Sequence, residues 1–267
     1  MRFSLIAFLT ALLSILVTNS AHGQQWRDSP EVAAVFQSAG VNGTFVLYDR
    51  QSGTFTGYNQ TRANTGYLPA STFKIVNALI GLDVGVVKDV NETIPFTGDD
   101  RGNKAWAKDM GLGEAIKVSN VPIFQELARR TGLERMQAEL IMIGYGNNET
   151  GNVVDTFWLE GPLRISAAEQ TFFLDRLACQ ALPLRNDVQE QVREILFMEE
   201  SGNAKIFAKT GLSMRTSPGT GWWVGWVELE DQIYPFAVNM DIKDFKTEGA
   251  KRIELGLASL KVLGIIE

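Results

Sequence analysis

The chain has 267 residues, and its 31 acidic against 25 basic side chains give a net charge of −6. No basic run appears, which argues against a nucleic acid as partner. The only histidine is His22 and the only cysteine is Cys179. After residue 23, therefore, the chain has no histidine for a Ser-His-Asp triad or a metal site, and one cysteine excludes an internal disulfide.

The first 23 residues have the pattern of a secretory signal peptide. Arg2 supplies a positive start, residues 5–17 form a short apolar run, and Ala21-His22-Gly23 places small residues where a signal peptidase cleaves. We expect cleavage near Gly23 and a periplasmic product with no membrane segment, because no later stretch is apolar enough to span a bilayer. A retained N-terminal anchor is the alternative.

Turn residues and apolar patterns predict five strands and two flanking helices outside the middle of the chain. Residues 222–227 do not alternate between apolar and polar, which predicts a central strand that is covered on both faces. The predicted elements are a helix at 31–39, a hairpin of strands 43–48 and 54–58, strands at 204–210, 221–229 and 233–241, and a last helix at 249–263.

The middle of the chain keeps helical periodicity with loops between the helices. One of these helices follows Ser166 and Glu169, which have the spacing of a capping box. Cys179 would follow on a buried helix position and is interpreted as a small core residue. The other predicted helices cover 72–84, 122–130, 133–143 and 186–199.

These elements predict an α+β fold. Residues 24–60 and 201–267 would form one antiparallel sheet with the N- and C-terminal helices beside it, and residues 61–200 would form an inserted helical part. A cleft between the two parts is the natural place for a site, and Ser71 lies where the chain crosses from one to the other.

Ser71 and Lys74 form the pair around which a catalytic hypothesis can be built. Residues three apart on a helix share a face, with Cβ atoms about 5–6 Å apart, so the two side chains can touch. A serine becomes a nucleophile when a base takes its proton, and lysine is a base only when burial lowers its pKa from about 10.4. The alternative is that Ser71 caps an ordinary helix and Lys74 is a solvated surface charge.

Four further motifs follow in order. Each has an ordinary structural explanation: Ser119 could cap the helix after it, and Trp158 could be core. S-x-x-K, a serine triplet and K-T-G together are the signature of penicillin-interacting serine enzymes. Here Val121 stands where that signature has a polar amide. The motifs are Ser119-Asn120-Val121, Tyr145-Gly146-Asn147, Trp158-Leu159-Glu160-Gly161 and Lys209-Thr210-Gly211.

In these motifs the chain resembles the class D serine β-lactamases, the oxacillinase family, from Thr44 to the C-terminal helix. The resemblance implies a penicillin-binding/β-lactamase-like fold and hydrolysis of β-lactams through an acyl-enzyme on Ser71. It also implies that Lys74 carries a carbamate formed with CO₂ (N6-carboxylysine), which is the general base, and that no metal or other cofactor is bound.

The sequence offers a physical reason for that modification. Only a neutral amine attacks CO₂, and burial in an apolar wall removes the proton from a lysine. An amide in place of Val121 would solvate the cation, whereas a valine cannot. The resulting anion needs donors, and the indole N–H of Trp158 could supply one. The side chains expected to support the carbamate are Phe73, Val121, Trp158 and Leu159, with Phe157 in the same wall.

The remaining roles follow from the resemblance. Ser119 would relay a proton to the leaving lactam nitrogen beside Lys209, and the backbone N–H groups of Ser71 and Leu212 would form the oxyanion hole. Arg252 is assigned to the substrate carboxylate, for which a guanidinium fork is well shaped; Lys251 is the alternative. The substrate-binding set is Lys209, Thr210, Gly211 and Arg252.

One departure from the family pattern, one loop and two alternative functions complete the interpretation. Val76 stands where many family members have proline, and loop 213–220 is expected to tune the substrate range. A penicillin-binding D-Ala-D-Ala peptidase and a β-lactam sensor that stays acylated are the alternatives, but Val121 and the W-L-E-G segment favour hydrolysis. The expected partner is a small β-lactam, with the protein a monomer or a homodimer.

Overall fold

The computed structural model of this chain describes residues 25–267. The predicted signal peptide, residues 1–23, lies outside the described residues. Within the described range, none of the helices has the length and apolar character that crossing a membrane requires.

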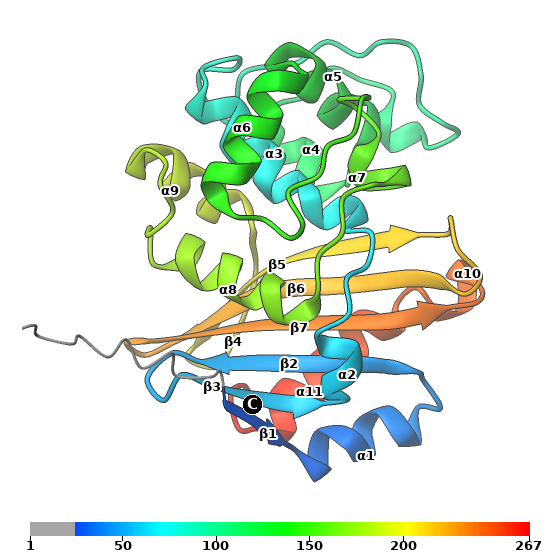
Figure 1. Cartoon of the computed structure of the whole chain (residues 1–267), viewed down its shortest axis with the longest axis vertical. Coiled ribbons are helices and arrows are strands. Elements are labelled where there is room, and N and C mark those ends of the chain that lie inside the picture. The colour runs from blue at the N-terminus through cyan, green and yellow to red at the C-terminus, as the bar shows by residue number, and fades with distance from the viewer. Residues whose placement is uncertain (1–24) are drawn as a thin grey trace, which may run out of the picture.

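One seven-stranded sheet runs through the described part of the chain, in the order β1-β3-β2-β7-β6-β5-β4 (Figure 1). Every neighbouring pair is antiparallel except β1 and β3, which are parallel, so the prediction of a purely antiparallel sheet was wrong at that edge. The strands are β1 Gln25–Asp28, β2 Gly43–Asp49, β3 Thr54–Tyr58, β4 Phe197–Ser201, β5 Ala204–Ser213, β6 Gly219–Leu229 and β7 Gln232–Ile242.

The two edge strands were missed by the sequence analysis. Strand β1 has only four residues, too few for a period-2 pattern. Strand β4 is almost wholly exposed, so no alternation of buried and exposed residues distinguishes it from the preceding helix, which ends at Ile195 rather than residue 199. The sheet therefore begins again at Phe197, before the predicted boundary at residue 200.

Strand β6 confirms the prediction of a central strand covered on both faces. It lies between β5 and β7 and is buried from Gly219 to Val227. Trp222 and Trp226 point into the core shared with the helical layer, whereas Trp223 points into the core on the opposite face. Apolar residues are needed at every position because neither face meets water.

Helices cover both faces of the sheet (Figure 1). On one face, α1 (Pro30–Ser38) contacts α11 (Lys251–Val262). On the other, α8 (Ala167–Ala178) lies directly against β2, β6 and β7. The Ser166–Glu169 capping box starts α8 as predicted. Cys179 follows as the C-cap of α8 and is only partly buried, so its interpretation as a core residue was wrong.

Most of the remaining helices form a layer over α8 and the sheet, with α3 in its centre (Figure 1). All but the last residue of α3 is buried, and the helix packs against α5 and α9. Two short helices lie outside this layer: α2 Gln60–Ala63 contacts β2, and α10 Phe245–Glu248 lies at the end of the sheet (Figure 1). The elements of the layer are the short turn η1 Ala70–Phe73, α3 Lys74–Asp83, the turn η2 Lys104–Trp106, α4 Leu112–Lys117, α5 Val121–Thr131, α6 Leu133–Ile143, α7 Phe157–Glu160 and α9 Asn186–Ile195.

Candidate active site

Ser71 and Lys74 lie in direct contact at the start of the central helix. Ser71 sits in the 3₁₀ turn η1, and Lys74 is the first residue of α3. Nζ of Lys74 donates a hydrogen bond to Oγ of Ser71 at 2.8 Å. Ala70, just before the serine, has φ of 49°, a left-handed conformation that is uncommon for a residue with a side chain and often occurs at functional sites.

Lys74 is completely buried, which contradicts the alternative of a solvated surface lysine. Burial, together with the nearby charges of Lys209 and Arg101, holds the pKa of Lys74 well below its ordinary value. Within residues 25–267 no carboxylate forms an ion pair with this amine, and the closest aromatic face is the Phe124 ring, 5.6 Å from Nζ to its centroid. The surroundings therefore favour a neutral amine.

Trp158 lies in the aromatic wall next to this pair. Its ring stacks on Phe73 at 5.1 Å between centroids and meets Phe157 edge-on at 5.0 Å. The indole Nε1 is buried and has no hydrogen-bond partner within residues 25–267. An unpaired buried donor costs about 1–3 kcal/mol, so this N–H is suited to an acceptor that the unmodified side chains do not provide. Leu159 packs against the same core while partly exposed.

Lys209 on β5 and Ser119 come together although 90 residues separate them. Nζ of Lys209 donates to Oγ of Ser119 at 3.1 Å and to the carbonyl oxygen of Thr210 at 2.9 Å. Burial and the neighbouring guanidinium of Arg252 lower the pKa of Lys209 to about 7. The N-cap of α5 is Asn120, not Ser119, so the capping alternative was wrong and the Ser119 hydroxyl is available for chemistry.

Ser71 and Ser119 line the same cavity, of about 330 Å³. Arg252 lines it and Lys251 does not, which favours Arg252 as the partner of a substrate carboxylate. Asn103, Trp106 and Phe245 also line it, and the sequence analysis did not find them because they carry no motif. The lining residues are Ser71, Asn103, Trp106, Ser119, Val121, Thr210, Gly211, Leu212, Phe245 and Arg252.

Gly211 explains how β5 comes close to the serine. A Cβ at this position would lie 3.0 Å from the carbonyl oxygen of Pro69 and 3.0 Å from Cγ2 of Thr72. Any larger residue would push the strand away from the η1 turn. The glycine thus allows β5 to pack against η1, and Ser71 and the next residue after the glycine, Leu212, both line the cavity.

The Tyr145-Gly146-Asn147 triplet lies behind the cavity and does not line it. Tyr145 is fully buried, and its hydroxyl accepts a hydrogen bond from Nε2 of Gln170 at 3.2 Å. The amide of Asn147 bonds to the backbone of Arg164 and Pro162. Gly146 has φ of 58° and lies against the Arg164 carbonyl. The triplet therefore fixes the segment that follows α7.

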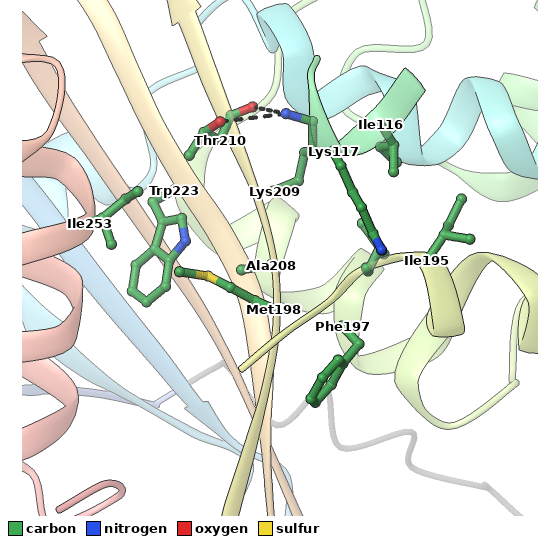
Figure 2. Close-up of a pocket in the computed structure, with 11 residues that line it drawn as sticks. Ile116, Lys117, Ile195, Phe197, Met198, Ala208, Lys209, Thr210, Trp223 and Ile253 are labelled. Atoms are coloured by element: carbon green, nitrogen blue, oxygen red, sulfur yellow. Dashed lines mark hydrogen bonds between the residues drawn. The ribbon is translucent and has the colours of Figure 1, made fainter. Parts of the chain in front are cut away.

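A second cavity, of about 520 Å³, lies beside Lys209 (Figure 2). Figure 2 shows the Lys209 ammonium bonded to Thr210, while apolar side chains such as Ile195 and Phe197 line the rest. Thr210 lines both cavities, but Ser71 and Ser119 line only the smaller one. The candidate active site is therefore the smaller cavity.

A serine in contact with a buried lysine, with a second serine and a K-T-G strand beside it, is typical of a penicillin-interacting acyl-transfer site. The comparison with family models agrees, because residues 43–256 match the penicillin binding protein transpeptidase domain. The fold is thus of the penicillin-binding/β-lactamase type.

Comparison with individual proteins identifies a narrower family within this class. The chain is 47% identical to β-lactamase OXA-5 of Pseudomonas aeruginosa over 78% of its own length and 79% of the relative's. It is 41% identical to β-lactamase OXA-48 of Klebsiella pneumoniae, covering 86% of this chain and 87% of that one. The crystal structure of FUS-1 (OXA-85), a class D β-lactamase from Fusobacterium nucleatum subsp. polymorphum, superposes with a TM-score of 0.87 at 43% identity and covers 90% of this chain and 100% of that one.

The chain belongs to the class D β-lactamases, as its motifs indicated. It is a serine β-lactamase, an enzyme that hydrolyses β-lactams.

Proposed function

We propose that the enzyme hydrolyses its β-lactam substrate through an acyl-enzyme on Ser71 and that Lys74 acts after carboxylation by CO₂. The observation that carries this proposal is the conjunction of a fully buried lysine in contact with Ser71 and an unpaired buried N–H on Trp158. An ammonium would have no counter-ion there, whereas a carboxylated lysine would accept the indole hydrogen.

Carboxylation of Lys74 needs no reactant other than CO₂. The lone pair of the neutral Lys74 amine forms an N–C bond to CO₂, and the nitrogen loses a proton to solvent, which leaves an anion. Phe73, Val121 and Leu159 would shield it from water, and Trp158 would donate to it. When present, the carbamate supplies a proton acceptor beside Oγ of Ser71, which an ammonium at that position does not.

The other side chains then carry the acyl transfer. Ser71 Oγ attacks the lactam carbonyl, and the backbone N–H groups of Ser71 and Leu212 hold the oxyanion, each donor contributing about 2.7–4 kcal/mol. As the lactam C–N bond breaks, Ser119 gives its proton to the ring nitrogen and recovers one from Lys209, 3.1 Å away. The proton that Oγ loses replaces the one that Lys209 gives up. Water then attacks the ester carbonyl, and one of its protons passes to Oγ as the C–O bond breaks, which regenerates Ser71 and releases the product acid.

Substrate recognition follows from the charges of the cavity. β-Lactams carry a carboxylate, and Arg252 lines the cavity, while the Lys209 amine lies next to two groups of the cavity wall, Ser119 and Thr210. Thr210 adds a hydroxyl there, and Gly211 leaves room along the strand. Trp106 and Phe245 offer apolar surface for the neutral side chain of the substrate.

The export of the protein is proposed on its N-terminal pattern alone. Cleavage near Gly23 would release a periplasmic enzyme, and N-terminal sequencing of the protein from a periplasmic fraction tests this. Size-exclusion chromatography with light scattering distinguishes a monomer from a homodimer, the two states that we expect.

The enzymatic proposal is tested with purified protein and a chromogenic cephalosporin. Multiple turnovers are expected, together with a carbamate resonance in the ¹³C NMR spectrum after addition of labelled bicarbonate. Full turnover with no such resonance would overturn the role of Lys74. One acylation per molecule without turnover would point to a sensor, and cleavage of a D-Ala-D-Ala peptide would point to a peptidase.

A further inference from the structure

One buried amide, that of Gln125, links the segment before Trp106, which lines the cavity, to the segment before Trp158. Gln125 lies on α5, immediately after Phe124, and is 7% exposed. Its Oε1 accepts a hydrogen bond from Nη2 of Arg101 at 2.6 Å. Its Nε2 donates to the backbone carbonyl oxygen of Asp155 at 2.7 Å. Both ends of the amide are therefore used.

The Arg101 end holds the loop that forms one wall of the cavity. Asn103 and Trp106, which line the cavity, follow Arg101 within five residues. Arg101 itself is exposed and has φ of 49°, so its backbone conformation is an uncommon one. Its guanidinium also forms an ion pair with Asp99 at 3.5 Å. The bond to Gln125 is the contact that ties this guanidinium to the helical core.

The Arg101 guanidinium also affects Lys74. Its positive charge contributes to the low pKa of the Lys74 amine. The same charge would stabilise an anion formed on that amine, because an opposite charge favours the ionised form. The position of Arg101 therefore bears on both the uncharged and the carboxylated state of the lysine.

The Asp155 end holds the segment that carries Trp158. Asp155 lies two residues before α7, whose second residue is Trp158. Nη1 of Arg129 also donates to the Asp155 carboxylate at 2.7 Å. Two residues of α5 therefore bind Asp155: Gln125 binds its backbone carbonyl and Arg129 binds its side chain. The entry of the chain into α7 is thus set by α5.

We propose that Gln125 is a positioning residue for the carboxylated lysine: it sets the Trp158 indole N–H and the Arg101 charge with respect to Lys74. The inference rests on the proposed function, since it concerns retention of the carbamate. The primary amide provides an acceptor for the guanidinium and a donor for the carbonyl at once. Glutamate keeps the acceptor and loses the donor, and methionine loses both.

Gln125→Met and Gln125→Glu are compared with the wild type and with a control, Arg130→Gln. Arg130 lies on the same helix and its exposed side chain pairs with Glu126, a kind of contact that contributes little to stability. The measurements are the ¹³C carbamate signal as labelled bicarbonate is titrated, turnover with and without added bicarbonate, and the melting temperature.

Both Gln125 variants are expected to need about 10- to 100-fold more bicarbonate for half-maximal carbamate signal, the range found when partners that orient a ligating group are removed. Saturating bicarbonate should restore most of their turnover, and Arg130→Gln should match the wild type. If Gln125→Glu shows the wild-type bicarbonate midpoint, the donor to Asp155 is not what positions Trp158 and the inference falls.

A purely structural role for Gln125 gives a different result. The melting temperature of the variants would fall while their bicarbonate midpoint stayed at the wild-type value, and this would overturn the inference alone. Absence of any carbamate signal in the wild-type enzyme would instead overturn the proposed base, and this inference with it.

Discussion

Nζ of Lys74 lies 2.8 Å from Oγ of Ser71, within a fully buried environment. The contact places a candidate base on the nucleophile, and burial lowers the pKa of that base. A lysine with an ordinary pKa would be charged at neutral pH and could not accept a proton. The low pKa of Lys74 removes this obstacle.

Replacing Lys74 with alanine should trap the acyl-enzyme. The variant lacks the base proposed for both Ser71 and the hydrolytic water, so any acylation that still occurs should not be followed by release. Mass spectrometry of the protein after mixing with a penicillin would detect the mass of the opened substrate on most molecules for minutes or longer. Rapid return to the free mass would show that another residue is the base.

Trp158→Phe should weaken retention of the carbamate while keeping the aromatic packing. Phenylalanine still stacks on Phe73 but has no N–H to donate. Activity at ambient CO₂ should fall by about 10- to 100-fold, by analogy with other lost orienting contacts, and recover with added bicarbonate. The control is Trp26→Phe on the exposed edge strand β1, whose indole bonds to Asp28. Equal bicarbonate dependence in both variants would mean that the Trp158 indole only packs.

The pKa of Lys209, about 7, predicts the alkaline limb of the pH profile. Below this value the ammonium is present in the free enzyme and attracts the substrate carboxylate. Above it the charge is lost, so kcat/KM for a carboxylate-bearing substrate should fall as the pH rises through about 7. Arginine stays protonated in this range, so Lys209→Arg should lose the limb centred there, even if its absolute activity is low. A limb at the same pH in the arginine variant would assign it to another group.

The lowered pKa of Lys209 also makes the free energy of unfolding depend on pH. Between about 7 and the ordinary value of 10.5, the unfolded chain binds a proton at Lys209 that the folded protein does not. The contribution of this site to the free energy of unfolding therefore rises with pH across that window, and the destabilisation is complete below it.

Arg252→Ala should raise KM for carboxylate-bearing substrates by about 10- to 100-fold, because hydrogen bonds to charged groups contribute about 1.5–3 kcal/mol. Lysine at this position should recover only part of the affinity, since it lacks the planar fork. Lys251→Ala is the matched control, adjacent on the same helix but outside the cavity. Steady-state kinetics would contradict the assignment if Lys251→Ala raised KM and Arg252→Ala did not.

The sequence by itself determined the class of the enzyme and most of the elements that carry its motifs. The order of S-x-x-K, the serine triplet and K-T-G can be read directly from the sequence. The capping box at Ser166 and the apolar run of β6 are likewise local sequence patterns. The start of α8 and the buried strand β6 could therefore be predicted from residues that are adjacent in the sequence. Short or exposed elements such as β1 and β4 carry no such signal, so they were missed.

Only the tertiary structure decided which groups meet. Lys209 reaches Ser119 across 90 residues, Arg252 rather than Lys251 faces the cavity, and Asn103, Trp106 and Phe245 arrive from loops without motifs. The protonation of a side chain and its hydrogen bonding also depend on the tertiary structure. Burial of Lys74 and the unpaired N–H of Trp158 result from side chains packed from α3, α5 and α7, and desolvation acts through three-dimensional neighbours that no local pattern specifies.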